Sequence, residues 1–168
     1  MISRRVHVRR LLFLIVAICG AVGLTASTAY ADSPHFIGTP TCTKSLSTGL
    51  VCSGKAAGLG NGPTAAFLTA DSVTAIYECV NKGGNVAPGQ PVVTQGVTGP
   101  TQTIPPHNGQ ITFSPSLPPP TPPSPATECP NGNWTVRLTS LTYTNVVLHI
   151  QQPPGTEVLT FAFGTIDP

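Results

Sequence analysis

Turn-forming residues recur at short intervals along this chain and leave room only for short elements between them. Glycine and proline account for 17 and 19 of the 168 residues, and clusters of these residues end helices and strands. Such clusters occur at Asn61-Gly62-Pro63, Lys82-Gly83-Gly84-Asn85, Asn108-Gly109, Asn131-Gly132 and Pro153-Pro154-Gly155. No sustained amphipathic helical pattern lies between them, so the sequence predicts short strands joined by turns.

Apolar and polar residues alternate over residues 73–79. Val73, Ala75, Tyr77 and Cys79 share one face, because successive side chains of a strand point to opposite faces, and we expect that face to be buried. Similar patterns predict strands over 111–113, 134–138, 141–143, 146–150 and 158–163, with weaker signals over 50–53 and 65–69. Asn108-Gly109 suits the positive φ angles of a tight hairpin turn before the strand at 111–113.

About seven short strands at this spacing predict an all-β fold, a single antiparallel β-sandwich. Large aromatic rings are expected to fill the space between its two sheets, namely Trp134, Tyr77, Tyr143, Phe67, Phe113, Phe161 and Phe163. A sugar-binding platform is the alternative for rings that lie exposed on one face. Residues 117–125 contain six prolines, which predict a stiff polyproline II loop that joins no central strand.

The first 31 residues have the parts of a secretory signal peptide. Four arginines precede an apolar run over 11–24, and Ala29-Tyr30-Ala31 predicts cleavage between Ala31 and Asp32. The run is shorter than the roughly 20 residues that span a bilayer. Residues 32–168 are therefore expected to be exported as one domain without a transmembrane anchor. Retention as an uncleaved anchor and lipidation of Cys19 are the alternatives.

Four cysteines remain in the exported part: Cys42, Cys52, Cys79 and Cys129. An even number of cysteines in an exported chain is typical of a disulfide framework, and three pairings are possible. The favoured pairing joins Cys42 to Cys52 across a short loop and Cys79 to Cys129 across the proline-rich loop. A zinc site is the alternative, but the close Cys-x-x-Cys pairs typical of such sites do not occur in the sequence.

Charge is sparse once the signal peptide is removed. Four of the eight Lys and Arg lie in it, which leaves Lys44, Lys55, Lys82 and Arg137 against six acidic residues, a net charge of −2. Binding to a nucleic-acid backbone requires clustered cations. Four scattered ones predict no nucleic-acid partner.

No pattern of reactive residues predicts catalysis. His35, His107 and His149 are isolated in the sequence, and the acids Asp71, Glu78, Glu128, Glu157 and Asp167 are dispersed. The Gly-x-Ser-x-Gly elbow of many hydrolases is absent from the sequence. The glycines of residues 58–62 precede a strand instead of a helix, which indicates a turn and not a phosphate loop. We therefore expect no enzyme activity, no cofactor and no metal site.

Three motifs support a resemblance to known proteins. Residues 54–61 (GKAAGLGN), 77–85 (YECVNKGGN) and 129–135 (CPNGNWT) together resemble small secreted proteins of actinomycetes that have no assigned activity, over about residues 52–155. This resemblance implies one exported domain. A looser likeness is to immunoglobulin-type sandwiches, in which a tryptophan lies between two bridged cysteines, whereas here Trp134 follows Cys129.

Two functions are compatible with these features. The first is a secreted, non-catalytic β-sandwich with a binding or structural role at the cell exterior, whose partner is an extracellular protein or an envelope glycan. The alternative is a small extracellular hydrolase or enzyme inhibitor whose reactive residues meet only in the fold.

Overall fold

The computed structural model describes residues 33–167. The predicted signal peptide, Cys19 and the predicted cleavage site between Ala31 and Asp32 lie outside these residues. Within the described range the chain forms ten strands and one short helix: β1 (His35–Ser45), β2 (Gly49–Ala57), β3 (Thr64–Val80), β4 (Val86–Pro88), β5 (Val92–Thr98), β6 (Gln102–Ile104), β7 (Ile111–Phe113), β8 (Ser116–Leu117), α2 (Pro125–Glu128), β9 (Thr135–Gln151) and β10 (Glu157–Ile166).

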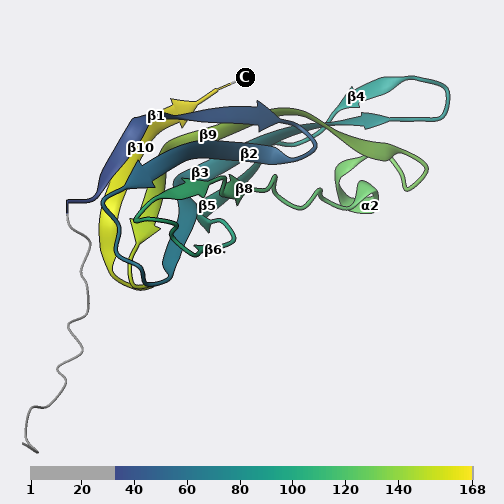
Figure 1. Cartoon of the computed structure of the whole chain (residues 1–168). Coiled ribbons are helices and arrows are strands. Elements are labelled where there is room, and N and C mark those ends of the chain that lie inside the picture. The colour runs from purple at the N-terminus through teal and green to yellow at the C-terminus, as the bar shows by residue number, and fades with distance from the viewer. Residues whose placement is uncertain (1–32, 168) are drawn as a thin grey trace, which may run out of the picture.

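The strands form two antiparallel sheets (Figure 1). The first has the order β1-β2-β7, with β8 also paired to β2, and the second has the order β10-β9-β3-β4, with β5 and β6 also paired to β3. Since β6, β5 and β4 pair with successive stretches of β3, they act as one interrupted edge strand. The predicted all-β antiparallel fold is confirmed.

A single hydrophobic core lies between the sheets. Its largest side chains come from β2, β7 and β8 on one side and from β3 and β9 on the other, and they include Leu50, Phe113, Leu117, Leu68, Leu141, Tyr143 and Leu148. Val73, Ala75, Tyr77 and Cys79 are all 2% exposed or less, so the face predicted from their alternation is buried. Full burial of one large apolar side chain contributes about 1.5–3 kcal/mol.

Strands β3 and β9 are each 17 residues long, where the sequence predicted several shorter ones. The predicted strands break at Asp71 and Asn145 because the alternation of apolar residues changes phase there. In the structure Asn145 adopts a positive φ of 51° and donates its amide to the Asp71 carboxylate at 2.7 Å. The interruption is therefore local, and both strands continue through it.

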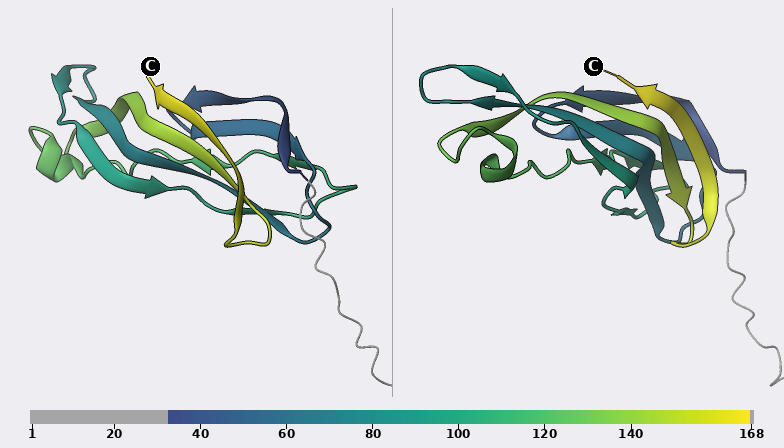
Figure 2. Two further views of the ribbon diagram at one scale, coloured as in Figure 1. Left: turned by 90° about the vertical axis from the view of Figure 1, so that its left-hand side faces the viewer. Right: turned by 180° about the vertical axis from the view of Figure 1, so that it is seen from behind.

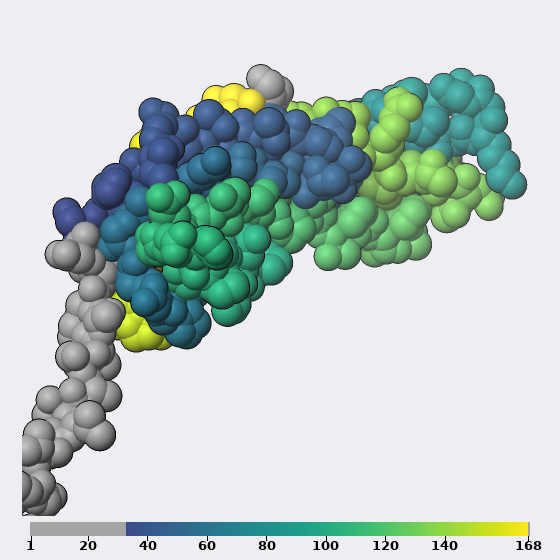
Figure 3. Space-filling view, in the orientation of Figure 1, coloured from purple at the N-terminus to yellow at the C-terminus, as the bar shows by residue number. Residues whose placement is uncertain are grey.

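A second interruption separates the two regions of the molecule. Ile76 pairs with Ser140 but Tyr77 pairs with Leu138, so Thr139 is an extra residue, a bulge that bends and twists the strand pair. Beyond it, residues 77–88 and 125–138 form an extension, here called the arm, that passes the end of the first sheet (Figures 2 and 3). The remainder of the two sheets is called the body.

The structure contains two disulfides, in the pairing favoured from the sequence. One joins Cys42 to Cys52, which are direct partners across β1 and β2. The other joins Cys79, near the end of β3, to Cys129, the residue after α2. The first therefore lies in the body, and the second holds α2 to the strands of the arm.

The proline-rich segment is shorter than predicted. Leu117 ends β8 and Pro125 begins α2, so the irregular stretch is 118–124. Two tyrosine hydroxyls hold it against the second sheet: Tyr143 donates to the Leu117 carbonyl at 3.1 Å, and Tyr77 donates to the Pro120 carbonyl at 3.0 Å. The two hydroxyls thereby donate to carbonyls at the end of β8 and just beyond it.

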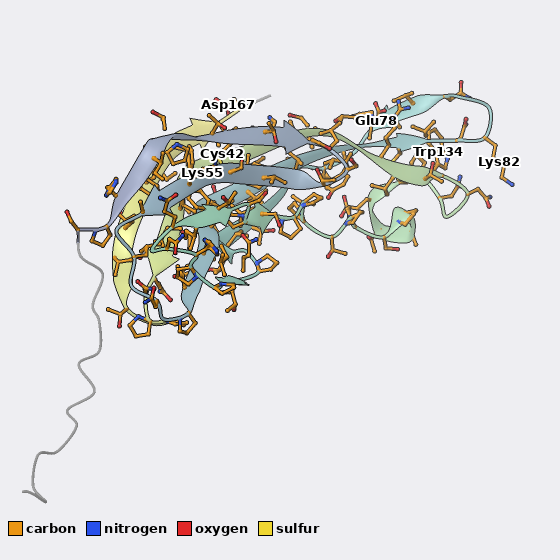
Figure 4. All side chains as sticks on the ribbon, viewed as in Figure 1. Cys42, Lys55, Glu78, Lys82, Trp134 and Asp167 are labelled. Carbon is orange, nitrogen blue, oxygen red and sulfur yellow. A yellow bond between two sulfur atoms is a disulfide. The ribbon has the colours of Figure 1, made fainter. Side chains whose placement is uncertain are left out.

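The aromatic core was predicted only in part. Tyr77, Tyr143 and Phe113 are buried, and Phe161 and Phe163 are partly buried against the core edge. The prediction is wrong for Phe67, which lies on the opposite face of β3 from Leu68. It is also wrong for Trp134, which precedes β9 and lies in the arm, beyond the end of the first sheet (Figure 4). Among the described residues, no helix is long and apolar enough to cross a membrane.

Candidate functional site

A hollow of about 510 Å³ lies at the tip of the arm. It is formed by the loop that follows β3 and the loop that precedes β9, and its lining residues are Asn81, Lys82, Gly83, Asn131, Asn133 and Trp134. Figure 4 shows Trp134 and Lys82 at this end of the molecule, far from Cys42 and Lys55 in the body. Since the hollow is open, a ligand could enter it without movement of the chain.

The loops of the hollow are fixed by their own asparagines. The Asn81 side-chain oxygen accepts hydrogen bonds from the backbone amides of Gly83 and Asn85, both at 2.9 Å, and Gly84 has a positive φ of 79°. The Asn131 oxygen accepts from the Asn133 amide at 3.0 Å. Turns of this kind are typical of asparagine and glycine, so the turn signals seen in the sequence also shape the hollow.

These bonds leave hydrogen-bond donors for a ligand. Because the oxygens of Asn81 and Asn131 are occupied, their side-chain amino groups remain, and each carries two donors. Trp134 adds an indole N–H and Lys82 an ammonium group. Lys82 is the one charged residue among those lining the hollow, so the site favours a ligand rich in acceptors and carrying negative charge.

One acid of the arm is already paired. Glu78 on β3 and Arg137 on β9 are cross-strand partners and form an ion pair. Among the described residues Lys82 takes part in no salt bridge. Its charge is therefore free to interact with a ligand.

A second cluster lies on the outer face of the second sheet. His149 on β9 approaches Thr69 on β3, with 2.9 Å between Nε2 and Oγ1, and Glu157 on β10, with 2.5 Å between Nδ1 and Oε2. Phe67 stacks on the imidazole with ring centroids 4.8 Å apart and planes inclined by 10°. A hydroxyl, an imidazole and a carboxylate are thus brought together from three adjacent strands.

Strand register explains this cluster, and the sequence alone did not reveal it. Phe67 is the direct partner of His149, and Thr69 is the partner of Val147. His149 is isolated in the sequence but not in the fold: Thr69 is 80 residues away in the sequence and becomes a neighbour only through the β3–β9 pairing. Only the short separation of His149 and Glu157 across the final hairpin offered a signal.

The other two histidines lie apart from this cluster. His35 begins β1 and its Nδ1 contacts the Ser33 carbonyl at 2.9 Å. His107 flanks the Asn108-Gly109 turn, whose two residues have positive φ angles of 51° and 69°, and lines a hollow of about 280 Å³ together with Lys55. The hairpin turn predicted at Asn108-Gly109 is confirmed by the two backbone hydrogen bonds between His107 and Gln110.

The dispersed acids do not converge on a metal site. Asp71, Glu78 and Glu157 are engaged by Asn145, Arg137 and His149 respectively. Over residues 33–167 no group of three or more histidine, cysteine, aspartate or glutamate side chains is arranged to hold a metal ion. All four cysteines of this range are in disulfides.

An apolar hollow of about 410 Å³ lies where the proline segment crosses the edge of the second sheet. Its lining includes Val73, Val92 and Val97 together with the run 118–121. It offers little polar chemistry, and its prolines belong to the segment held by Tyr143 and Tyr77.

Comparisons with protein-family models, with curated proteins and with solved structures each give no match to the chain.

Proposed function

We propose that this chain is an exported, non-catalytic binding protein with an immunoglobulin-like β-sandwich, and that the tip of the arm binds an envelope glycan. The observation that carries the proposal is the half-buried Trp134 ring, set among hydrogen-bond donors in an open hollow. Sugars present apolar C–H faces and many acceptor oxygens, and an aromatic ring beside donors complements both.

The sandwich class is supported by the strand order. In immunoglobulin-type domains the first, second and fifth strands share one sheet, and the third, sixth and seventh share the other. If β4, β5 and β6 count as one edge strand, and β7 and β8 as another, β1-β2-β7 and β10-β9-β3 follow that order. The fourth strand departs from it, because it pairs with β3 and not with the fifth strand. The disulfides depart from it, because the cysteines here do not join β2 to β9.

Export is supported by the cysteines together with the predicted signal peptide. Disulfides persist in oxidising compartments outside the cytosol, and both bridges here join separate structural elements. The partner is then expected outside the cell, in keeping with an envelope glycan.

The charge of the hollow narrows the class of glycan. Lys82 is unpaired among the described residues and is the charged residue of the lining, so a carboxylate-bearing sugar is favoured over a neutral one. An exposed ion pair contributes only about 0.2–1 kcal/mol. The acidic sugar is therefore expected to bind a few-fold more tightly than its neutral counterpart.

Two sugars that differ by one acidic group provide the test. N-acetylmuramic acid is N-acetylglucosamine with an added lactyl carboxylate, and oligomers containing each can be titrated calorimetrically into residues 32–168. We expect the acidic oligomer to bind more tightly, Lys82→Gln to remove the preference, and Trp134→Ala to remove binding of both. Lys55→Gln, at an exposed lysine of the body, is the matched control. Equal binding by the wild type and the Trp134→Ala variant would contradict the proposal.

A small hydrolase is the second candidate, and one observation favours it: the contact of His149 with both Thr69 and Glu157. None of the three hollows described above includes these residues. A screen of purified protein against ester, peptide and glycoside substrates tests this function. Turnover that His149→Gln abolishes would favour the hydrolase over the binding protein.

A further inference from the structure

The three polar groups on the outer face of the second sheet are arranged in the order of a nucleophile, a base and an orienting acid. Thr69 Oγ1 lies 2.9 Å from His149 Nε2, and His149 Nδ1 lies 2.5 Å from Glu157 Oε2. In a hydroxyl–imidazole–carboxylate triad the hydroxyl meets one ring nitrogen and the carboxylate meets the other. The same assignment holds here, on strands β3, β9 and β10.

Hydrogen-bond chemistry fixes the tautomer of the neutral imidazole. A carboxylate can only accept hydrogen bonds, so the proton of His149 must reside on Nδ1, facing Glu157. Nε2 then carries a lone pair, and the Thr69 hydroxyl donates to it. The stacked Phe67 ring holds the imidazole in its plane. Thr69 is thus the one side chain among these four that can lose a proton to a base already in contact with it.

The cluster is also accessible. The His149 and Glu157 side chains are 19% and 45% exposed, and Thr69 is partly exposed on the same face. A reagent can therefore approach the cluster from solvent, and replacement of any of the three leaves the buried core untouched.

We propose that Thr69 is an acyl-acceptor site, which reacts with activated esters to form an O-acyl threonine. Thr69 Oγ1 forms a bond to the ester carbonyl carbon while its proton passes to His149 Nε2. The bond from that carbon to the leaving oxygen then breaks, and the leaving alkoxide or phenoxide takes the proton from Nε2. The products are the Thr69 ester and the free alcohol or phenol, with no change of oxidation state.

The surroundings favour one acylation over repeated turnover. Acylation and hydrolysis both develop an oxyanion that aimed donors would stabilise, but the neighbouring backbone of β3 and β9 is paired in the sheet, as Phe67 with His149 and Thr69 with Val147. Only an activated ester, with its good leaving group, is then expected to react, and hydrolysis of the threonine ester, whose leaving group is a poor alkoxide, is expected to be slow. The acyl group is therefore expected to remain on Thr69. Acylation of Thr69 is compatible with a protein that otherwise acts by binding, because Thr69 lies in the body and the proposed glycan site lies at the tip of the arm.

Peptide mapping after treatment with p-nitrophenyl acetate tests the proposal. In the folded wild-type protein we expect an acetyl group on Thr69 and none on Thr74, a threonine of the same strand and face. His149→Gln should slow this labelling by about a hundredfold, the usual contribution of a general base. Thr69→Ser should retain labelling at the same position, and Thr74→Val, the matched control, should leave it unchanged.

Glu157 acts through His149 and is a positioning residue. Glu157→Gln should slow acetylation of Thr69, and Glu157→Asp should restore part of the rate, which a purely structural loss would not do. Circular dichroism of each variant verifies the fold. Acetylation confined to lysines, equal labelling of Thr69 and Thr74, or a Thr69 rate that His149→Gln leaves unchanged would each overturn the proposal.

Discussion

The body and the arm are built from the same two long strands, and they differ in what covers those strands. In the body, β3 and β9 face a second sheet, and residues such as Leu68, Leu141 and Leu148 are fully buried. In the arm no second sheet faces them: Tyr77 and Cys79 are covered by the proline segment and by the residues around α2, and α2 itself has no buried residue. The comparison shows that the same strand pair can supply a core where it is covered and a ligand surface where it is not.

Different interactions therefore stabilise the two regions. The body is stabilised mainly by apolar burial, which is proportional to the area removed from water. The arm relies on specific bonds instead: the Cys79–Cys129 disulfide, the Glu78–Arg137 ion pair and the Thr135 hydroxyl donating to the Val80 carbonyl at 3.1 Å. Variants in the two regions should therefore have different consequences.

The largest effect is expected in the body. Leu148 is 0% exposed, and Leu148→Ala should lower the free energy of unfolding by about 2–5 kcal/mol, because it leaves a cavity between the sheets. Ile76→Ala is the control, since Ile76 is 46% exposed and surface changes stay within about 0.5 kcal/mol. Urea denaturation measures both. Similar losses in the free energy of unfolding for the two variants would contradict the claim that burial between the sheets stabilises the body.

The two disulfides provide a second comparison, because one lies in the body and the other in the arm. Cys79 and Cys129 are 50 residues apart and Cys42 and Cys52 are 10 apart, so chain entropy predicts losses of about 4 and about 3 kcal/mol respectively when each pair is changed to serine. Thermal unfolding measures them. Only the Cys79→Ser, Cys129→Ser variant should also lose glycan binding, because that bridge holds the arm. Loss of binding in the Cys42→Ser, Cys52→Ser variant at a temperature where it is folded would contradict this.

How far the sequence predicted these regions also differs. The alternation at 73–79 predicted the buried face of β3 correctly, because periodicity reports which side of a strand is covered. It could not predict that β3 and β9 run on through Asp71 and Asn145, since the hydrogen bond between these two residues forms only after pairing. The strand β1 was missed because Gly38 and Pro40 interrupt its pattern at an irregularity in the β1–β2 register.

The candidate sites were less predictable than the core. Turn signals at 82–85 and 131–132 marked the loops of the arm tip, but their approach to Trp134 depends on the β3–β9 register. The ring was expected in the core because aromatic residues usually lie there, and the sequence does not show where the second sheet ends. The contact of His149 with Thr69 likewise depends on long-range pairing.

A smaller effect on the free energy of unfolding is expected at Tyr143, which donates to the Leu117 carbonyl. Burial raises the pKa of Tyr143 above its ordinary value of 10.0, and Tyr143→Phe should cost about 0.5–1.5 kcal/mol by removing the bond to Leu117. In the wild type the neutral hydroxyl is favoured by folding, so this stability is fully present below pH 10 and is lost as pH rises through the raised pKa. Denaturation across this alkaline range measures the loss, which should be smaller for Tyr143→Phe. If Tyr143→Phe lost as much stability over this pH range as the wild type, the loss would come from titratable groups other than the Tyr143 hydroxyl.

The smallest effect on stability is expected at Trp134. Because no second sheet covers it, Trp134→Ala should change the free energy of unfolding by only about 0.5 kcal/mol, although it is expected to remove glycan binding. Differential scanning calorimetry measures the stability. A loss as large as that of Leu148→Ala would place this ring in the core after all.

Hydrogen exchange of the wild-type protein, followed with and without the acidic oligosaccharide, most directly tests whether the body forms the stable core and the tip of the arm binds the ligand. Amides of the covered stretch 141–150 should exchange only through global unfolding, whereas those of 81–85 and 129–134 should open locally and exchange much faster. Addition of the sugar should slow exchange in these two arm loops specifically. Arm loops as protected as the body without ligand, or a ligand effect centred on the body, would contradict the account.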